Sequence, residues 1–117
     1  MQLQLYGKKI WLFRKAVDFR RSIDGLLSVI SQESQYKVAD GIYLFYNKDR
    51  NKVKCLSWHK NGYILLYKRL EKGRFYFTED RKTGAIEMSI DELSWLLAGL
   101  DWQTMRQWGE LSYDKFS

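Results

Sequence analysis

Residues 41–77 read GIYLFYNKDRNKVKCLSWHKNGYILLYKRLEKGRFYF, and this stretch decides the fold class. Four runs within it, GIYLFY, VKCLSW, YILLYKRL and RFYF, are rich in the aromatic and branched residues that strands favour. Asn61-Gly62 lies between the second and third runs, and such a pair suits a tight hairpin turn. Glu71-Lys72-Gly73 provides another turn before the fourth run. The stretch therefore predicts a meander of antiparallel strands.

Two amphipathic helices are predicted, one before the meander in the chain and one after it. Five apolar residues share one face of the first helix: Phe19, Ile23, Leu26, Leu27 and Ile30. Asp18 could cap this helix, and Gly25 inside it suggests the close approach of another backbone. Ser89 and Glu92 form a capping box for the second helix, which Gly99 is placed to end.

The expected architecture follows from this order of elements. Residues 9–14 (KIWLFR) and a segment through Ile86 predict short strands outside the meander. We expect one α+β domain over residues 1–117, with an antiparallel sheet meander and the two amphipathic helices on one face. Residues 103–117 form an aromatic C-terminal tail that either packs on the sheet or binds a partner.

The composition indicates a soluble protein of the cytoplasm. Hydrophobic residues make up 45% of the 117 residues, which suffices for a core and argues against disorder. No apolar run approaches the roughly 18 residues of a membrane span, and the N-terminal residues lack the pattern of a signal peptide. A lone cysteine, Cys55, fits a reducing compartment.

The net charge of +6 is unevenly distributed along the chain. Residues 48–74 contain nine basic and two acidic residues, and residues 1–21 contain six basic and one acidic. Residues 75–117 contain eight acidic and four basic residues. This polarity predicts a basic surface for a polyanion and a separate surface for another partner, although basic charge can also serve solubility alone.

The sequence offers little catalytic chemistry. His59 lies beside the predicted hairpin turn, and no Cys or His stands at metal-ligand spacing from it. A pair between Cys55 and His59 is left open by their spacing. Three aspartates, Asp18, Asp24 and Asp40, could in principle hold a metal ion, but their spacing does not support it. We therefore predict no enzyme activity, no cofactor and no metal.

The basic and aromatic residues predict a nucleic-acid interface. Alternation along a strand places Tyr63, Tyr67 and Arg69 on one face, where they could follow a phosphate backbone and stack on bases. Tyrosines are also ordinary strand residues. The candidate contacts are Arg14, Arg20, Arg21, Lys54, Trp58, Tyr63, Tyr67, Lys68, Arg69, Lys72 and Arg74. Arg20 and Arg21, expected in the first helical turn, either pair with nearby aspartates or meet a phosphate.

A family resemblance is carried by five motifs in this order: Asp18-Phe-Arg20-Arg-Ser-Ile-Asp24-Gly25-Leu26, Lys54-Cys-Leu-Ser-Trp58, Asn61-Gly62-Tyr63, Tyr67-Lys68-Arg69-Leu70-Glu71-Lys72-Gly73-Arg74-Phe75 and Leu96-Leu97-Ala-Gly99-Leu100-Asp101-Trp102. Together they resemble the short accessory protein, called TnpB or Orf2-like, of bacterial insertion sequences of family sixty-six. The resemblance runs from about residue 6 to residue 103. Ser22, Ser57 and Tyr76-Phe77 depart from the family pattern, which has Gly, Trp and Trp-Pro there.

The resemblance implies a role in DNA transposition beside a separate transposase that performs the chemistry. Two hypotheses remain open. The first is an accessory factor that binds the DNA ends of the element. The second is an adaptor that docks on the transposase, without contacting DNA, through Trp58, Trp95, Trp102 and Trp108. The sequence leaves the oligomeric state open.

Overall fold

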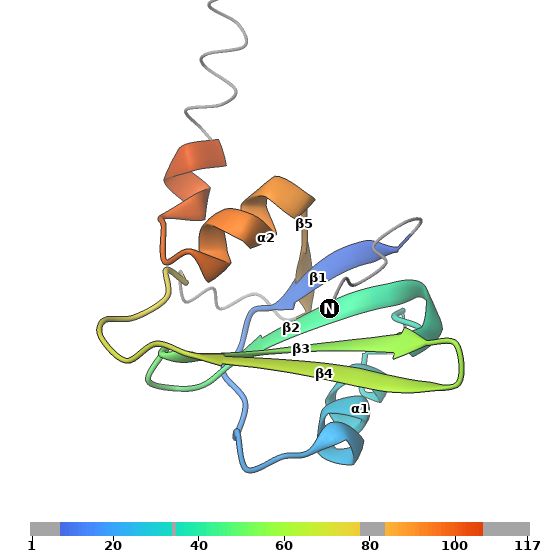
Figure 1. The fold of residues 1–117 in the computed structure, drawn as a ribbon. Coiled ribbons are helices and arrows are strands. Elements are labelled where there is room, and N and C mark those ends of the chain that lie inside the picture. Colours follow the sequence, from blue (N-terminus) through green and yellow to red (C-terminus); the bar gives the residue numbers. More distant parts are fainter. Residues whose placement is uncertain (1–7, 34, 78–83, 107–117) are drawn as a thin grey trace, which may run out of the picture.

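The computed structural model describes residues 8–33, 35–77 and 84–106. The elements are β1 (Lys9–Phe13), α1 (Ile23–Ser31), the short 3₁₀ turn η1 (Val38–Asp40), β2 (Gly41–Tyr46), β3 (Lys52–His59), β4 (Gly62–Arg69), β5 (Ala85–Met88) and α2 (Ile90–Leu97). Residues 102–106 form a further helical segment. The strands make one sheet in the order β4-β3-β2-β1-β5 (Figure 1).

The sheet confirms the α+β class and the antiparallel meander, which comprises β2, β3 and β4. β1 and β5 also pair antiparallel, but β1 and β2 are parallel, with Ile10 opposite Ile42 and Leu12 opposite Leu44. A parallel pair needs a crossover connection, and the segment that contains α1 supplies it. The sheet is therefore mixed, because β1 pairs in parallel with β2, the outer strand of the meander, while the other strand pairs are antiparallel.

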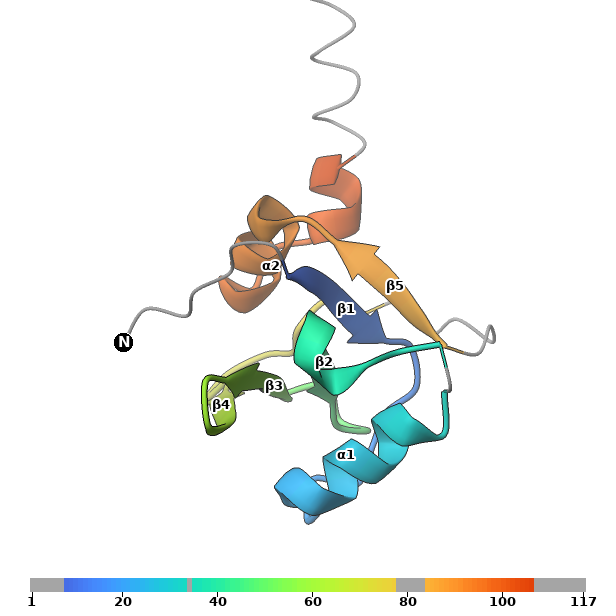
Figure 2. The same ribbon diagram turned by 90° about the vertical axis from the view of Figure 1, so that its right-hand side faces the viewer.

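The two helices cover opposite faces of the sheet, whereas the sequence analysis placed both on one face (Figures 1 and 2). Leu26 and Ile30 of α1 are buried in one core cluster with Phe45. Leu93 and Leu96 of α2 are buried in a second cluster. The reason is visible in β2, where all six residues are buried, since a strand covered on both faces is apolar throughout.

The first helix begins later than predicted. Its N-cap is Ser22, and the Asp18 carboxylate instead accepts a hydrogen bond from the Arg20 backbone N–H at 2.9 Å. Arg20 and Arg21 therefore precede the helix and do not oppose its dipole. A Cβ on Gly25 would lie 2.9 Å from the Cβ of Arg21, so the close neighbour is a side chain and not another backbone.

The segment 74–77 is not a strand, contrary to the prediction. After Gly73, which has a positive φ of 79°, the chain leaves the edge of the sheet, and the Phe75 N–H bonds to the Arg50 carbonyl at 2.7 Å. Phe75 and Phe77 are nevertheless buried while Tyr76 is exposed, as alternation requires. Packing in the core cluster of α2 replaces pairing with β4.

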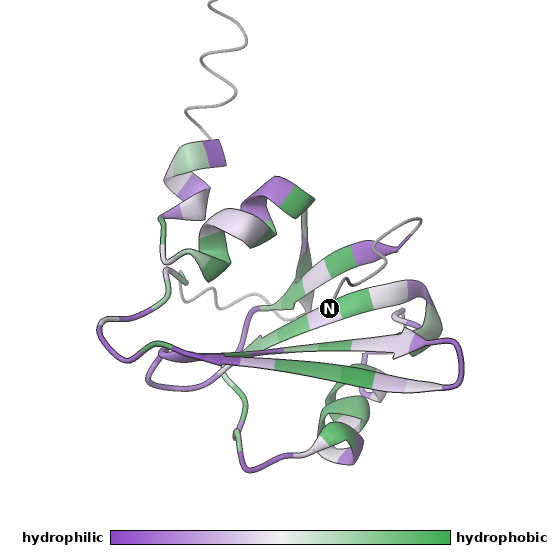
Figure 3. Ribbon diagram, viewed as in Figure 1, coloured by the Kyte–Doolittle hydropathy of each residue, from purple (hydrophilic) through white to green (hydrophobic). Residues whose placement is uncertain are grey.

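The predicted hairpin turn and the predicted caps of the second helix are confirmed. β3 and β4 form a hairpin that closes at His59 opposite Gly62, although the positive φ belongs to Lys60 (54°) and not to Gly62. The capping box at the start of α2 is present, and the residue after its C-cap, Gly99, has a φ of 80°. Hydrophilic residues gather in the loops that join the strands, and apolar residues lie along the strands (Figure 3).

Candidate nucleic-acid interface

A groove of about 460 Å³ opens at the end of the sheet where β2 and β4 end and β3 begins. Three parts of the chain line it: the segment that leads into α1, the loop between β2 and β3, and two strand residues. The lining residues are Val17, Asp18, Phe19, Arg20, Asn47, Lys48, Asp49, Lys52 and Tyr67. The volume falls in the range of sites that bind small ligands, about 300–1,000 Å³.

The loop between β2 and β3 is fixed by Asn47, which is buried. Its Oδ1 accepts hydrogen bonds from the backbone N–H groups of Asn51 and Lys52, at 3.1 and 2.9 Å. Its Nδ2 donates to the side chain of Asn51 at 2.7 Å. These bonds hold the backbone on both sides of Lys48, so its ammonium group extends from a defined loop.

Lys54 fixes the opposite wall of the groove. Its Nζ donates to the carbonyl oxygens of Phe19 and Arg21, both at 2.9 Å, and lies 4.8 Å from the centroid of the Phe19 ring. Burial lowers the pKa of this lysine, and the charge of Asp18 acts against that shift. Lys54 is only 8% exposed, so it is a tie between β3 and the loop and not the phosphate contact that the sequence suggested.

The rim of the groove carries exposed positive charge. Arg20 binds the Asp18 carboxylate through Nε and Nη2, and this hydrogen bonding lowers the pKa of Asp18 to about 2. The guanidinium group is thus oriented while its side chain stays 91% exposed. Among the residues that the structure describes, Lys48 and Lys52 have no carboxylate partner. Arg69 pairs with Glu71 at 3.0 Å.

The structure brings seven of the eleven predicted residues to this groove or to the end of the sheet where it opens. Lys54 and Tyr67 are opposite each other on β3 and β4, and Arg69 lies opposite Lys52 on the same face. Arg20 and Arg21 belong to the connection that Lys54 holds. Lys72 and Arg74 are exposed on the turn that follows β4 at this end of the sheet.

The other four predicted residues lie elsewhere. Trp58 and Tyr63 share the face of Tyr67 but lie at the hairpin, where the centroids of their own two rings are 4.9 Å apart. Tyr63 is about 13 Å from Tyr67 along the strand. Lys68 is on the α2 face, where its Nζ donates to the Leu97 carbonyl at 2.6 Å. Arg14 lines a small cavity on that face.

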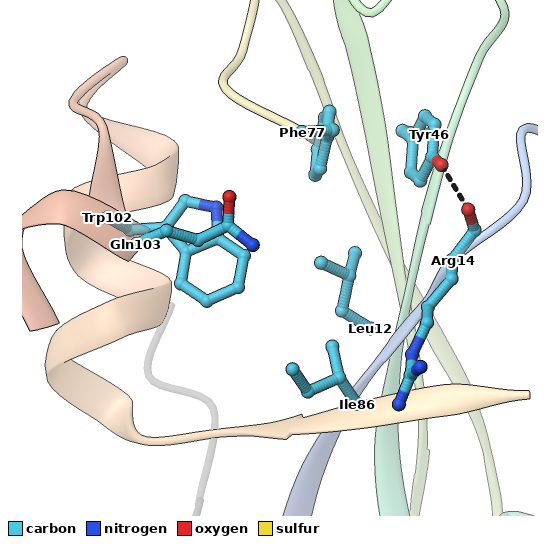
Figure 4. Close-up of a pocket in the computed structure, with 7 residues that line it drawn as sticks. All are labelled: Leu12, Arg14, Tyr46, Phe77, Ile86, Trp102 and Gln103. Atoms are coloured by element: carbon cyan, nitrogen blue, oxygen red, sulfur yellow. Dashed lines mark hydrogen bonds between the residues drawn. The ribbon is translucent and has the colours of Figure 1, made fainter. Parts of the chain in front are cut away.

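That cavity has a volume of about 100 Å³ and lies between α2, the helical segment after it and the sheet (Figure 4). It is lined by Leu12, Arg14, Tyr46, Phe77, Ile86, Trp102 and Gln103. The Tyr46 hydroxyl donates to the Arg14 carbonyl, which fixes the chain as it leaves β1. Most of the lining residues belong to the core, and the cavity is separated from the groove by the sheet.

Seven residues that line the groove were not among the predicted contacts; of these, Phe19 forms a wall, and Lys48 and Lys52 are cations. The signal for Lys52 was present, since it precedes Lys54 by two positions on a strand and must share its face. Lys48 gave no such signal, because it lies in a loop whose conformation depends on Asn47.

The positions of Cys55 and His59 exclude the catalytic pair that their spacing in the sequence left open. They are four positions apart on β3, about 13 Å, and therefore do not form a catalytic pair. No group of three or more His, Cys, Asp or Glu side chains within the described ranges could hold a metal ion. In the same part of the chain, no helix has the length and apolar character needed to cross a bilayer.

Cys55 is expected to be unreactive in the folded protein. Burial raises the pKa of its thiol to about 12, so almost no thiolate forms at pH 8. A disulfide reagent should label the native protein very slowly, and labelling should become fast and complete in guanidinium chloride. Rapid stoichiometric labelling without denaturant would contradict this burial.

The chain is similar to a known protein family over most of its length. The family model described as IS66 Orf2 like protein matches residues 8–107. The chain belongs to this family. The resemblance found in the sequence is thereby confirmed, and the match covers every described strand and helix of this IS66 Orf2-like protein.

Two relatives come from Sinorhizobium fredii (strain NBRC 101917 / NGR234). The uncharacterized protein y4jC is 36% identical over 102 residues, which cover 86% of each chain. The uncharacterized protein y4hO is 28% identical over 96 residues, which cover 81% of this chain and 83% of the relative. No solved structure matches the IS66 Orf2-like chain. Its family is that of an accessory protein of insertion sequences.

Proposed function

We propose that this protein is a non-catalytic, cytoplasmic accessory factor of transposition that binds DNA through the groove on the α1 face. One observation carries the proposal: Arg20, Lys48 and Lys52 line the same concavity as an exposed tyrosine, Tyr67, together with the carboxylates of Asp18 and Asp49. Cations that follow a phosphate backbone and an aromatic ring on which bases stack are the two parts of a general nucleic-acid site. The ends of the mobile element are the expected DNA.

The distribution of charge supports this orientation. Residues 85–106 contain four acidic side chains, Glu87, Asp91, Glu92 and Asp101, and one basic side chain, Arg106. They belong to β5, at the edge of the sheet farthest from β4, and to α2 with the residues after it, over the opposite face. A polyanion is therefore repelled from one side of the molecule and attracted to the other.

The alternative of an adaptor that contacts only the transposase has less support. Trp102 is 1% exposed, and its Nε1 donates to the Tyr76 carbonyl at 2.9 Å, so it is a core residue and not an exposed anchor. Trp95 packs against the α2 cluster and Trp58 against Tyr63. Trp108 lies outside the described residues, as does the tail from residue 107 onward. The transposase of the same element remains a proposed partner, for a surface other than the groove.

The proposal is tested by titrating the protein against a labelled duplex of the element's terminal repeat and a scrambled duplex at several salt concentrations. We expect tighter binding to the repeat and a steep loss of affinity with salt. If neither the duplexes nor their separated strands bind at low salt, the DNA-binding proposal is wrong, and capture by the transposase becomes the function to test.

Replacing both Lys48 and Lys52 by alanine should weaken duplex binding and make it less sensitive to salt. Each lysine that neutralises a phosphate contributes about 0.9 to the slope of log affinity against log salt, so the slope should flatten by about 1.8. Lys37→Ala is the single-charge control, because Lys37 is exposed and precedes β2 at the other end of the sheet. An equal change of slope per lysine removed in both variants would show that only net charge matters.

A further inference from the structure

Tyr67 differs from the exposed tyrosines Tyr63 and Tyr76 because it lines the groove, where its ring is 51% exposed and packs against neighbours on one side. The Phe19 ring lies 6.3 Å away, centroid to centroid, at an angle of 53°. The Lys54 ammonium lies 5.9 Å from the centroid of the Tyr67 ring. Because Phe19 is itself held through its carbonyl by Lys54, the tyrosine ring has a fixed neighbour. Little conformational entropy is therefore lost when another ring stacks on it.

Duplex and single-stranded DNA would present different groups to the groove. A duplex presents phosphates at its surface, within reach of Lys48 and Lys52, but the faces of its bases are covered by the neighbouring base pairs. An unpaired nucleotide can lay its base on the Tyr67 ring while its phosphates meet the two lysines. Extruding a base from a duplex costs a few kcal/mol, which an already single-stranded segment does not pay.

We propose that the groove takes single-stranded DNA, with one unpaired base stacked on Tyr67 and the adjoining phosphates at Lys48 and Lys52. This inference rests on the proposed function and specifies the form of DNA that the site prefers. The bonds of Asn47 to the backbone of Lys52 and of Lys54 to the segment before α1 fix the walls of the groove before DNA arrives. Base identity is read weakly, since every base offers a face for stacking.

The test compares three ligands: a labelled oligothymidylate, the same strand annealed to its complement, and a strand of equal length that carries abasic sites. Binding is followed by fluorescence anisotropy at constant salt. The wild-type protein should bind the single strand more tightly than the duplex, and the abasic strand should lose this advantage. Salt sensitivity should remain in all three, because the phosphates are retained.

Tyr67→Ala should weaken binding of the single strand by about 5- to 150-fold, which corresponds to the loss of one base–aromatic stack. Tyr67→Phe keeps the ring and should retain the affinity. Tyr76→Ala is the matched control, because Tyr76 is 52% exposed but does not line the groove. Circular dichroism and urea unfolding establish that each variant is folded.

Equal affinity for single strand and duplex, or equal effects of Tyr67→Ala and Tyr76→Ala, would overturn this inference. If the salt-dependent duplex binding then persists, the proposed DNA-binding function stands without it. Absence of binding to every DNA form at low salt would overturn both.

Discussion

Replacing Trp102 by alanine is expected to destabilise the protein by about 3–5 kcal/mol, the usual cost of removing a large buried aromatic side chain. The indole is 1% exposed and belongs to the core cluster beneath α2. Its loss leaves a void and removes the hydrogen bond from Nε1 to the Tyr76 carbonyl. Trp102→Phe, which keeps a ring but not the donor, should fall between alanine and the wild type.

Urea unfolding followed by circular dichroism measures these differences. Ile90→Ala is the control, because Ile90 starts α2 but is 55% exposed, and its truncation should change stability by no more than about 0.5 kcal/mol. Unchanged stability of Trp102→Ala together with lost capture of the transposase would instead identify Trp102 as an interface anchor and restore the adaptor hypothesis.

The second large effect is expected at Lys54. Lys54→Met keeps the apolar stem but removes the ammonium group that binds the carbonyls of Phe19 and Arg21. Hydrogen bonds from a charged donor contribute about 1.5–3 kcal/mol each, and the desolvation of the lysine offsets part of this. We therefore expect a loss of about 2–3 kcal/mol in the free energy of unfolding. Backbone amides of residues 17–22 should also exchange faster with solvent.

Lys52→Met is the matched control on the same face of β3. Lys52 contributes charge to the groove, so its variant should flatten the salt dependence of DNA binding and leave stability nearly unchanged. Lys54→Met should do the reverse: lower stability, weaken DNA binding by loosening the groove wall, and preserve the salt slope. A flatter slope in Lys54→Met would mean that this lysine reaches a phosphate after all.

The elements that could be predicted from the sequence are those with a local cause. The β3–β4 hairpin follows from alternation around a tight turn, and α2 follows from the reciprocal bonds of Ser89 and Glu92. The parallel pairing of β1 with β2 has no local cause, because it joins residues about 32 positions apart. The continuous apolar run of β2 is typical of a strand covered on both faces, so the sequence already indicated that the two helices lie on opposite faces of the sheet.

The same distinction applies to the groove. Tyr67 and Arg69 were predicted to share a face because strand alternation is local, and the structure places them so. The burial of Lys54 could not be predicted, since its partners are 33 and 35 residues away and a lysine in a strand is ordinarily exposed. Lys68 was also predicted to contact DNA because a lysine in a strand is ordinarily exposed. Its ammonium group instead donates a hydrogen bond to the Leu97 carbonyl at the C-terminal end of α2.

The position of β1 between β2 and β5 sets the order in which a chain emerging from the ribosome can fold. The hairpin of β3 and β4 joins neighbouring residues and can form as soon as both strands have left the exit tunnel. β1 is synthesised first but pairs on one side with residues 41–44 and on the other with residues 85–88. Until residue 88 is free, β1 is an open edge, which invites pairing with another nascent chain. Translation speed over the last third of the message should therefore govern how much of this protein aggregates during synthesis.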